Sequence, residues 1–208
     1  MMSIPTRFIV LAVSCLLMSA AQTAFGCGEE RWAVKMVQDD HRKYFYVGKK
    51  VSSGELVPAV DTTVAKLSKE PWPFEWKPRQ FSQPWADHLR AGTAEFTIWQ
   101  LTATIIEKRN EDDGDYHLVL KSGKKKMIGE IPSDECVEDS PRPIKAMVRK
   151  ARSDLDAYLA LPGNSASHMN ARVRLTGIGF FDRVHGGVGQ VKKNGIELHP
   201  IIKIEFLD

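Results

Sequence analysis

The sequence predicts a mainly β protein with one helix, built as an OB-like five-stranded barrel of order β-β-β-α-β-β with an N-terminal Pro/Trp-rich extension. Three segments with strand character lie within residues 96–131. One amphipathic segment follows at 144–159, and two further strand-like segments occupy 171–177 and 195–206. A helix between the third and fourth strands is the order found in OB-folds. A different small barrel or a sandwich is the alternative.

Residues 1–26 have the layout of a secretory signal peptide. Arg7 is the only charge before Glu29, an apolar run covers residues 8–18, and small residues lead to Ala24-Phe25-Gly26. The run is shorter than the roughly 20 apolar residues of a membrane span. We therefore expect cleavage, a mature chain with no transmembrane segment, and a secreted or periplasmic location.

Two cysteines, Cys27 and Cys136, remain after cleavage. They form an even pair in an oxidising compartment. We expect a disulfide between them, which in the chain-entropy model contributes about 4–5 kcal/mol for a loop of that length. Lipoprotein anchoring at Cys27 is the less favoured alternative, because Ala24 and Phe25 replace the usual residues of a lipobox.

The extension covers residues 27–93 and precedes the barrel domain at 94–208. Residues 29–37 suggest a short strand or an ordered arm, and 62–67 a short helix with a threonine N-cap. Prolines and large aromatics crowd residues 68–85 and exclude a regular helix or central strand there. We interpret this stretch as an extended connector whose aromatics cover the edge of the core, in preference to a ligand-stacking platform.

The first three strands form a predicted meander. Residues 96–106 are rich in Thr, Ile, Trp and Phe and predict a long strand that ends at the acidic turn 110–114. Residues 115–120 alternate, which is typical of a strand. Ser122-Gly123 turns the chain into a third strand over 126–131.

The helix is predicted over 144–159, with Pro143 in its first turn and Pro162-Gly163 after its end. Its apolar stripe recurs at spacings of three and four residues. The stripe consists of Ile144, Val148, Ala151, Leu155 and Leu159. We expect this face to pack against the barrel.

The last two strands complete the barrel. In 171–177, valine and leucine alternate with Arg172 and Arg174, which we expect to point outward. The final strand, 195–206, has an inner face of Ile196, Leu198, Ile202 and Ile204. Glu197 and His199 belong to its opposite face and are expected to project outward, as is His117.

Five sequence blocks resemble those of an uncharacterised group of secreted bacterial proteins. They are Arg31-Trp32 with Val34-Lys35 after a cysteine, Asp115-Tyr116-His117-Leu118-Val119, Glu130-Ile131-Pro132 before Cys136, Thr176-Gly177-Ile178-Gly179-Phe180-Phe181-Asp182 before His185-Gly186, and Asn194-Gly195-Ile196-Glu197-Leu198-His199-Pro200. The resemblance implies export and a shared single-domain fold, and no activity. The Trp-rich stretch at 71–85 departs from the group by its length.

Three of these blocks place a carboxylate beside a histidine: Asp115 with His117, Asp182 with His185, and Glu197 with His199. Such pairs can bind a divalent metal or act as acid and base. The candidate catalytic residues are His117, Asp182, His185, Glu197 and His199, and the candidate metal ligands are His117, His185 and His199. The spacing matches no recognised metal signature, so structural use of each pair is the favoured alternative.

A glycine-rich loop at 182–189 joins the last two strands, where OB-folds build one wall of their binding site. Gly186 and Gly187, together with Arg172 and Arg174, are therefore candidate ligand-binding residues. These arginines and Lys124-Lys125-Lys126 could also hold single-stranded nucleic acid. The formal net charge of +3, which falls to +2 when Arg7 is removed, does not favour that partner.

These observations predict an exported, soluble, single-domain binding or accessory protein whose ligand and partners are unknown. The alternative is a metal-dependent hydrolase, a nuclease or phosphoesterase, that uses the histidine and carboxylate residues named above with a divalent metal as cofactor. The sequence contains no recognisable nucleophile triad, phosphate loop or Cys-x-x-Cys pair.

Overall fold

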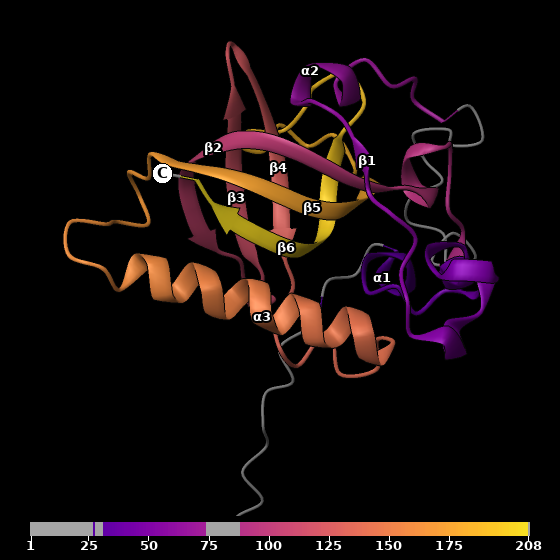
Figure 1. Cartoon of the computed structure of the whole chain (residues 1–208). Coiled ribbons are helices and arrows are strands. Elements are labelled where there is room, and N and C mark those ends of the chain that lie inside the picture. Colours follow the sequence, from indigo (N-terminus) through magenta and orange to yellow (C-terminus); the bar gives the residue numbers. More distant parts are fainter. Residues whose placement is uncertain (1–26, 28–30, 74–87, 208) are drawn as a thin grey trace, which may run out of the picture.

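The chain folds around a closed five-stranded barrel (Figure 1). The computed structural model describes residues 27, 31–73 and 88–207. The barrel strands are β2 (Ile98–Asn110), β3 (Tyr116–Ser122), β4 (Lys125–Ile131), β5 (Ala171–Phe181) and β6 (Ile196–Phe206). They follow the order β2-β3-β4-β6-β5, and β5 pairs back with β2. The β4–β6 pair is parallel and the other four are antiparallel. This is an OB-like barrel, which confirms the predicted fold class.

Strands β2 and β5 are both longer than their sequence patterns suggest. Strand β5 continues four residues beyond Gly177 to Phe181, and its last residues, including Ile178 and Phe180, are buried. The pattern of alternating arginines ends at Arg174 because the second half of the strand is buried on both faces. Alternation therefore marks only the half of β5 with a solvated face.

Helix α3 (Arg142–Leu159) lies between β4 and β5 in the chain and runs along one end of the barrel (Figure 1). The predicted stripe is confirmed, with Ile144, Val148, Ala151 and Leu155 buried and Leu159 partly buried. The guanidinium group of Arg152 donates to the backbone carbonyls of Gly114, Ile131 and Pro132 at 2.9–3.2 Å. The helix is thus bonded to the loops that precede β3 and follow β4.

The N-terminal part contains short elements outside the barrel, one of which is a two-residue strand that pairs in parallel with β2. They are α1 (Trp32–Lys35), β1 (Val60–Asp61), α2 (Val64–Leu67) and the 3-10 helices Asp40–Phe45, Val47–Lys49, Val51–Ser53 and Ala94–Phe96. The expectation of a strand at 29–37 is wrong, because Trp32–Lys35 forms a helical turn; the alternative of an ordered arm fits the burial of Ala33 and Val34. The predicted threonine cap is Thr63, whose hydroxyl accepts from the Lys66 amide.

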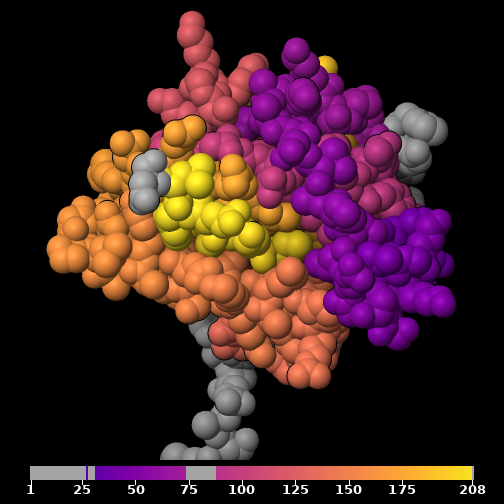
Figure 2. All heavy atoms as spheres, in the orientation of Figure 1, coloured from indigo at the N-terminus to yellow at the C-terminus, as the bar shows by residue number. Residues whose placement is uncertain are grey.

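This N-terminal arm, residues 31–46, covers one side of the barrel (Figure 2). Two buried ion pairs attach it, Arg31 with Glu95 and Asp39 with Arg90. A disulfide joins Cys27 to Cys136 with their Cα atoms 5.5 Å apart, as expected from the even pair.

Two sequence predictions fall outside the described residues. They are the signal peptide at 1–26 and the part of the Trp-rich connector from residue 74 onward. Within the described part of that connector, the Trp72 ring lies 6.2 Å from the Phe181 ring, consistent with an aromatic that covers the core edge. No helix in the described ranges combines the length and apolar character that a membrane span requires.

Candidate functional site

A cavity of about 840 Å³ lies over β3 and β4, between the β2–β3 loop (residues 111–115) and the β5–β6 loop (residues 182–195). In OB-folds this face and these two loops form the usual binding surface. Carboxylates are the commonest charged groups in its lining: Glu111, Asp112, Asp113, Glu130 and Asp182. Cationic side chains are fewer, namely Lys35, Arg109 and Arg183, and the two imidazoles are His117 and His185.

Glu130, on β4, lies at the centre of the site. Its Oε1 is 3.0 Å from Nδ1 of His117, and its Oε2 is 2.8 Å from Nδ1 of His199. His117 on β3 is the register partner of Glu130, and His199 comes from β6, the other neighbour of β4. One carboxylate thus joins two of the histidines that the sequence singled out.

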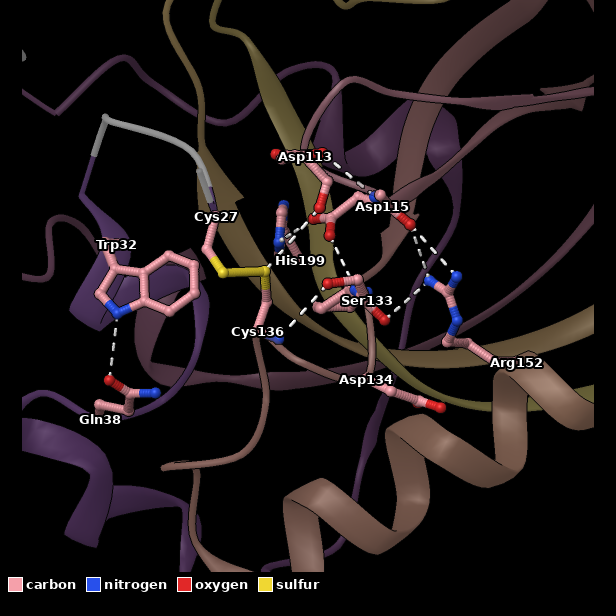
Figure 3. Close-up of a disulfide and its surroundings, with 12 residues drawn as sticks. Cys27, Trp32, Gln38, Asp113, Asp115, Ser133, Asp134, Cys136, Arg152 and His199 are labelled. Carbon is pink, nitrogen blue, oxygen red and sulfur yellow. Dashed lines mark hydrogen bonds and ion pairs between the residues drawn. A yellow bond between two sulfur atoms is a disulfide. The ribbon is translucent and has the colours of Figure 1, made fainter. Parts of the chain in front are cut away.

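Two further carboxylates surround His199 (Figure 3 shows the Asp115 side). Asp115 Oδ2 lies 3.5 Å from His199 Nε2, while Asp115 Oδ1 accepts from the Ser133 amide at 2.8 Å. On the other side of the ring, Glu197 Oε1 lies 3.3 Å from Nδ1. The imidazole is therefore flanked by three carboxylates.

The outer face that carries these groups is buried, contrary to the expected outward projection into solvent. His117, His199 and Glu197 are 7%, 1% and 2% exposed. The N-terminal arm contacts the residue beside His199: Arg31 and Lys35 lie over the Phe180 ring at 4.8 and 5.3 Å. The Phe180 ring in turn lies 5.8 Å from that of His199.

Hydrogen bonds decide the charge of the two imidazoles. Burial lowers the pKa of His199, but its bonds to Glu130 and Glu197 outweigh that effect and raise the pKa to about 10. Burial likewise lowers the pKa of His117, and Glu130 raises it to about 9. Both rings therefore hold a second proton at neutral pH.

The three carboxylates differ because their partners differ. Burial opposes ionisation of Glu130, yet hydrogen bonds from both histidines hold its pKa well below the usual range. Burial, together with the negative charge of Glu130, raises the pKa of Glu197 to about 8. Burial also raises the pKa of Asp115, to about 6. The cluster thus places an anion at Glu130 and a protonated carboxyl at Glu197, an arrangement that can hold or move a proton.

Asp182 and His185 pair with each other at the rim of the cavity. Their Oδ2 and Nε2 atoms are 3.4 Å apart, and the His185 side chain is 58% exposed. The side-chain oxygen of Gln190 accepts from the amides of His185 and Gly186 at 3.0 Å each. The loop is tied to the site below by the 3.1 Å contact between the Val188 carbonyl and His117 Nε2.

One group among the described residues has the composition and spacing of a metal-binding set: Asp115, Glu130 and His199. Each offers one ligand atom, and these atoms lie within 4.8 Å of one another. Of the three histidines named as candidate ligands, His199 belongs to this group, whereas His117 contacts it through Glu130 and His185 lies at the rim.

The candidate ligand-binding residues separate into two places. Gly187 lines the cavity, and Gly186 precedes it in the same loop. Arg172 and Arg174 are exposed on β5 and pair in register with β2, so they belong to a different face from the cavity lining. The structure does not bring the arginines to the histidine cluster.

Two central residues, Glu130 and Lys35, were absent from the sequence-based set. Glu130 belongs to one of the blocks of resemblance, and hairpin geometry offers a further signal for it. A two-residue turn at Gly123-Lys124 pairs Ser122 with Lys125. Five residues further from the turn on each strand, His117 lies opposite Glu130. Lys35 had no such signal, because nothing local to residues 31–37 shows which face of the barrel the arm covers.

Comparisons with known proteins leave the family open. No family model and no curated protein matches the sequence. A crystal structure described as a "putative aspartyl-tRNA synthetase from Leishmania major Friedlin" aligns with a TM-score of 0.38 and 12% sequence identity. The alignment covers 72% of this chain and 21% of that chain.

Proposed function

We propose that this protein is an exported binding or accessory module whose ligand occupies the cavity between the β2–β3 and β5–β6 loops. The position of that cavity carries the proposal, since it coincides with the binding face of OB-folds. The signal-like segment at 1–26 and the Cys27–Cys136 disulfide support export to a secreted or periplasmic location. The resemblance to secreted bacterial proteins supports the same location.

The charges of the cavity favour a small cationic or polar ligand over a polyanion. Five carboxylates line it against three permanently cationic side chains and the protonated His117, so the lining stays net negative and would repel a phosphate backbone. The basic residues of the β3–β4 hairpin and β5 lie elsewhere on the surface. Nucleic acid is therefore the disfavoured partner at this site.

A ligand panel combined with a blocked cavity tests the proposal. The panel contains polyamines, amino acids, neutral oligosaccharides, nucleotides and single-stranded DNA, each measured by the shift in Tm. A ligand that binds only the folded state raises Tm increasingly as its concentration exceeds Kd. We expect stabilisation by at least one cationic or neutral class, and loss of that shift in His185→Trp, which fills the exposed rim.

Arg174→Trp is the matched control, because it adds the same ring at an exposed position on β5 away from the cavity. It should leave the ligand-induced shift unchanged. The proposal fails if no class raises Tm, or if Arg174→Trp removes the shift and His185→Trp retains it.

A second candidate function is a metal-dependent hydrolase, favoured by the proximity of Asp115, Glu130 and His199 beside the cavity. A divalent ion held by such residues can activate water for hydrolysis of a phosphoester. Assays with p-nitrophenyl phosphate, bis-p-nitrophenyl phosphate and single-stranded DNA would show activity that EDTA abolishes and added metal restores. Activity that persists in EDTA, or that survives in His199→Gln, contradicts this candidate.

A further inference from the structure

The Asp115–Glu130–His199 group contains a buried ring nitrogen without a hydrogen bond, which is not expected of a network whose polar atoms all bond to one another. Nε2 of His199 is buried and has no hydrogen-bond partner in the structure. It faces Asp115 Oδ2 at 3.5 Å. That separation exceeds the range of about 2.7–3.2 Å for N–H···O hydrogen bonds. Both side chains are at most 2% exposed, so no bulk water serves that nitrogen.

The same separation fits two ligands of one ion. Zinc bonds to imidazole nitrogen and carboxylate oxygen are about 2.0–2.2 Å long, so neighbouring ligand atoms of a tetrahedral ion lie about 3.3–3.6 Å apart. The distance from Nε2 to Asp115 Oδ2 is within that interval. The Glu130 carboxylate supplies the third ligand atom of the group.

Groups outside the ligand set hold both ligands in orientation. The second ring nitrogen of His199, Nδ1, lies 2.8 Å from Glu130 Oε2 and 3.3 Å from Glu197 Oε1. Metal-binding histidines commonly donate this other N–H to a carboxylate. The Ser133 amide fixes the second oxygen of Asp115. Ser133 itself is anchored near the disulfide, because its hydroxyl accepts from the Cys136 amide at 3.3 Å (Figure 3).

We propose that Asp115, Glu130 and His199 form a binding site for a divalent transition metal, with Zn²⁺ best suited to their nitrogen and oxygen atoms. The ion replaces the proton on Nε2 of His199, because a metal ligand must be deprotonated. Glu130 also lines the cavity, so the ion would lie next to it. Three protein ligands leave a fourth position for water or for a ligand. The inference concerns the metal alone and holds whatever the cavity binds.

Metal content tests the site directly. The exported, disulfide-bonded protein is stripped with a chelator, incubated with ZnSO₄ or CoCl₂, gel-filtered and analysed for bound metal. We expect about one Zn²⁺ per chain, an increase in Tm with Zn²⁺, and visible absorption typical of tetrahedral Co²⁺. Metal well below one equivalent, with no change in Tm, overturns the proposal and indicates that the Lys35 ammonium group balances the carboxylates instead.

Variants then identify the ligands. Asp115→Asn and His199→Gln should abolish stoichiometric binding, and Glu197→Gln should weaken it about 10–100-fold as the loss of an orienting group does. His168→Gln, a histidine exposed on another surface, is the matched control and should retain one equivalent. Near-UV circular dichroism of the metal-free variants separates lost ligands from lost folding. Full binding by a folded Asp115→Asn protein, or loss in His185→Gln alone, contradicts the assignment.

Discussion

Buried charges attach the arm to the barrel through single, highly connected residues. Arg31 and Glu95 have side chains with no solvent exposure and bond to each other. The Glu95 carboxylate also accepts from the amides of Ala91 and Phe181 at 2.6 and 2.8 Å, while Arg31 donates to backbone carbonyls. Because each partner satisfies the other's charge in a dry environment, loss of one leaves the other charge uncompensated.

Arg31→Met should therefore destabilise the protein strongly. We expect the free energy of unfolding to fall by about 3–5 kcal/mol, the range for removal of one partner of a buried pair. Arg149→Met is the control, since Arg149 pairs with Glu138 on the surface. Such surface pairs contribute about 0–1 kcal/mol. Urea denaturation of both variants checks the difference. Equal losses for the two would show that burial of Arg31 does not govern the interaction.

At the scale of elements, helix α3 shows how far local pattern predicts tertiary packing. Its stripe lies on one side of the helix and needs one apolar surface, which the barrel supplies. The aromatic ring of Tyr158 extends this contact by stacking on Phe206 of β6, with ring centroids 4.2 Å apart. The helix is thus packed along its length from Ile144 to Tyr158.

Truncation of the stripe near its C-terminal end tests that packing. Leu155 is fully buried. Leu155→Ala should therefore lower the free energy of unfolding by about 2–5 kcal/mol through lost burial and a residual cavity. Leu161→Ala removes the same atoms just beyond the helix, from a residue that is 56% exposed. This control should change the free energy of unfolding by about 0.5 kcal/mol or less. Chemical denaturation measures both. A small effect at Leu155 would mean that α3 does not depend on this contact.

The elements were predictable where one face meets water and the other meets the core. That condition holds for α3 and the first half of β5, and their bounds follow the sequence closely. It fails for His199, because a polar residue opposite an apolar face is expected in solvent, whereas His199 is 1% exposed and lies beside Phe180, which the arm contacts. The histidines of the candidate site were therefore predictable from the sequence, but Lys35 and the burial of the site were not, because both depend on contacts between segments far apart in the sequence.

At the scale of the molecule, the arm, the barrel and the disulfide form one connected structure around the histidine cluster. Cys27 precedes the arm, and Cys136 follows the turn whose Ser133 fixes Asp115. Arg31 and Asp39 each bond across to the segment 90–95. The arm therefore has attachments on both sides of α1, and the disulfide is one of them.

Reduction of the disulfide shows whether the bond stabilises the protein by restricting the unfolded chain or by holding the arm in the native state. The cross-link joins cysteines at a sequence separation of 109, so it restricts the unfolded chain. Its removal should lower the free energy of unfolding by about 2–5 kcal/mol. The measurement is urea denaturation with and without reductant, with Cys27→Ser as the control that reductant should not affect. Intact mass first verifies the bond by the absence of two hydrogens.

The arm itself should remain docked after reduction, because the ion pairs of Arg31 and Asp39 and the buried residues Met36 and Val37 still hold it. The amides of Val34 and Met36 are hydrogen-bonded within α1 and its cap, so hydrogen exchange reports on the arm directly. If the disulfide acts through the unfolded state, these amides and those of α3 should lose protection together. Faster exchange confined to the arm would instead show that the disulfide holds the arm against the barrel in the native state.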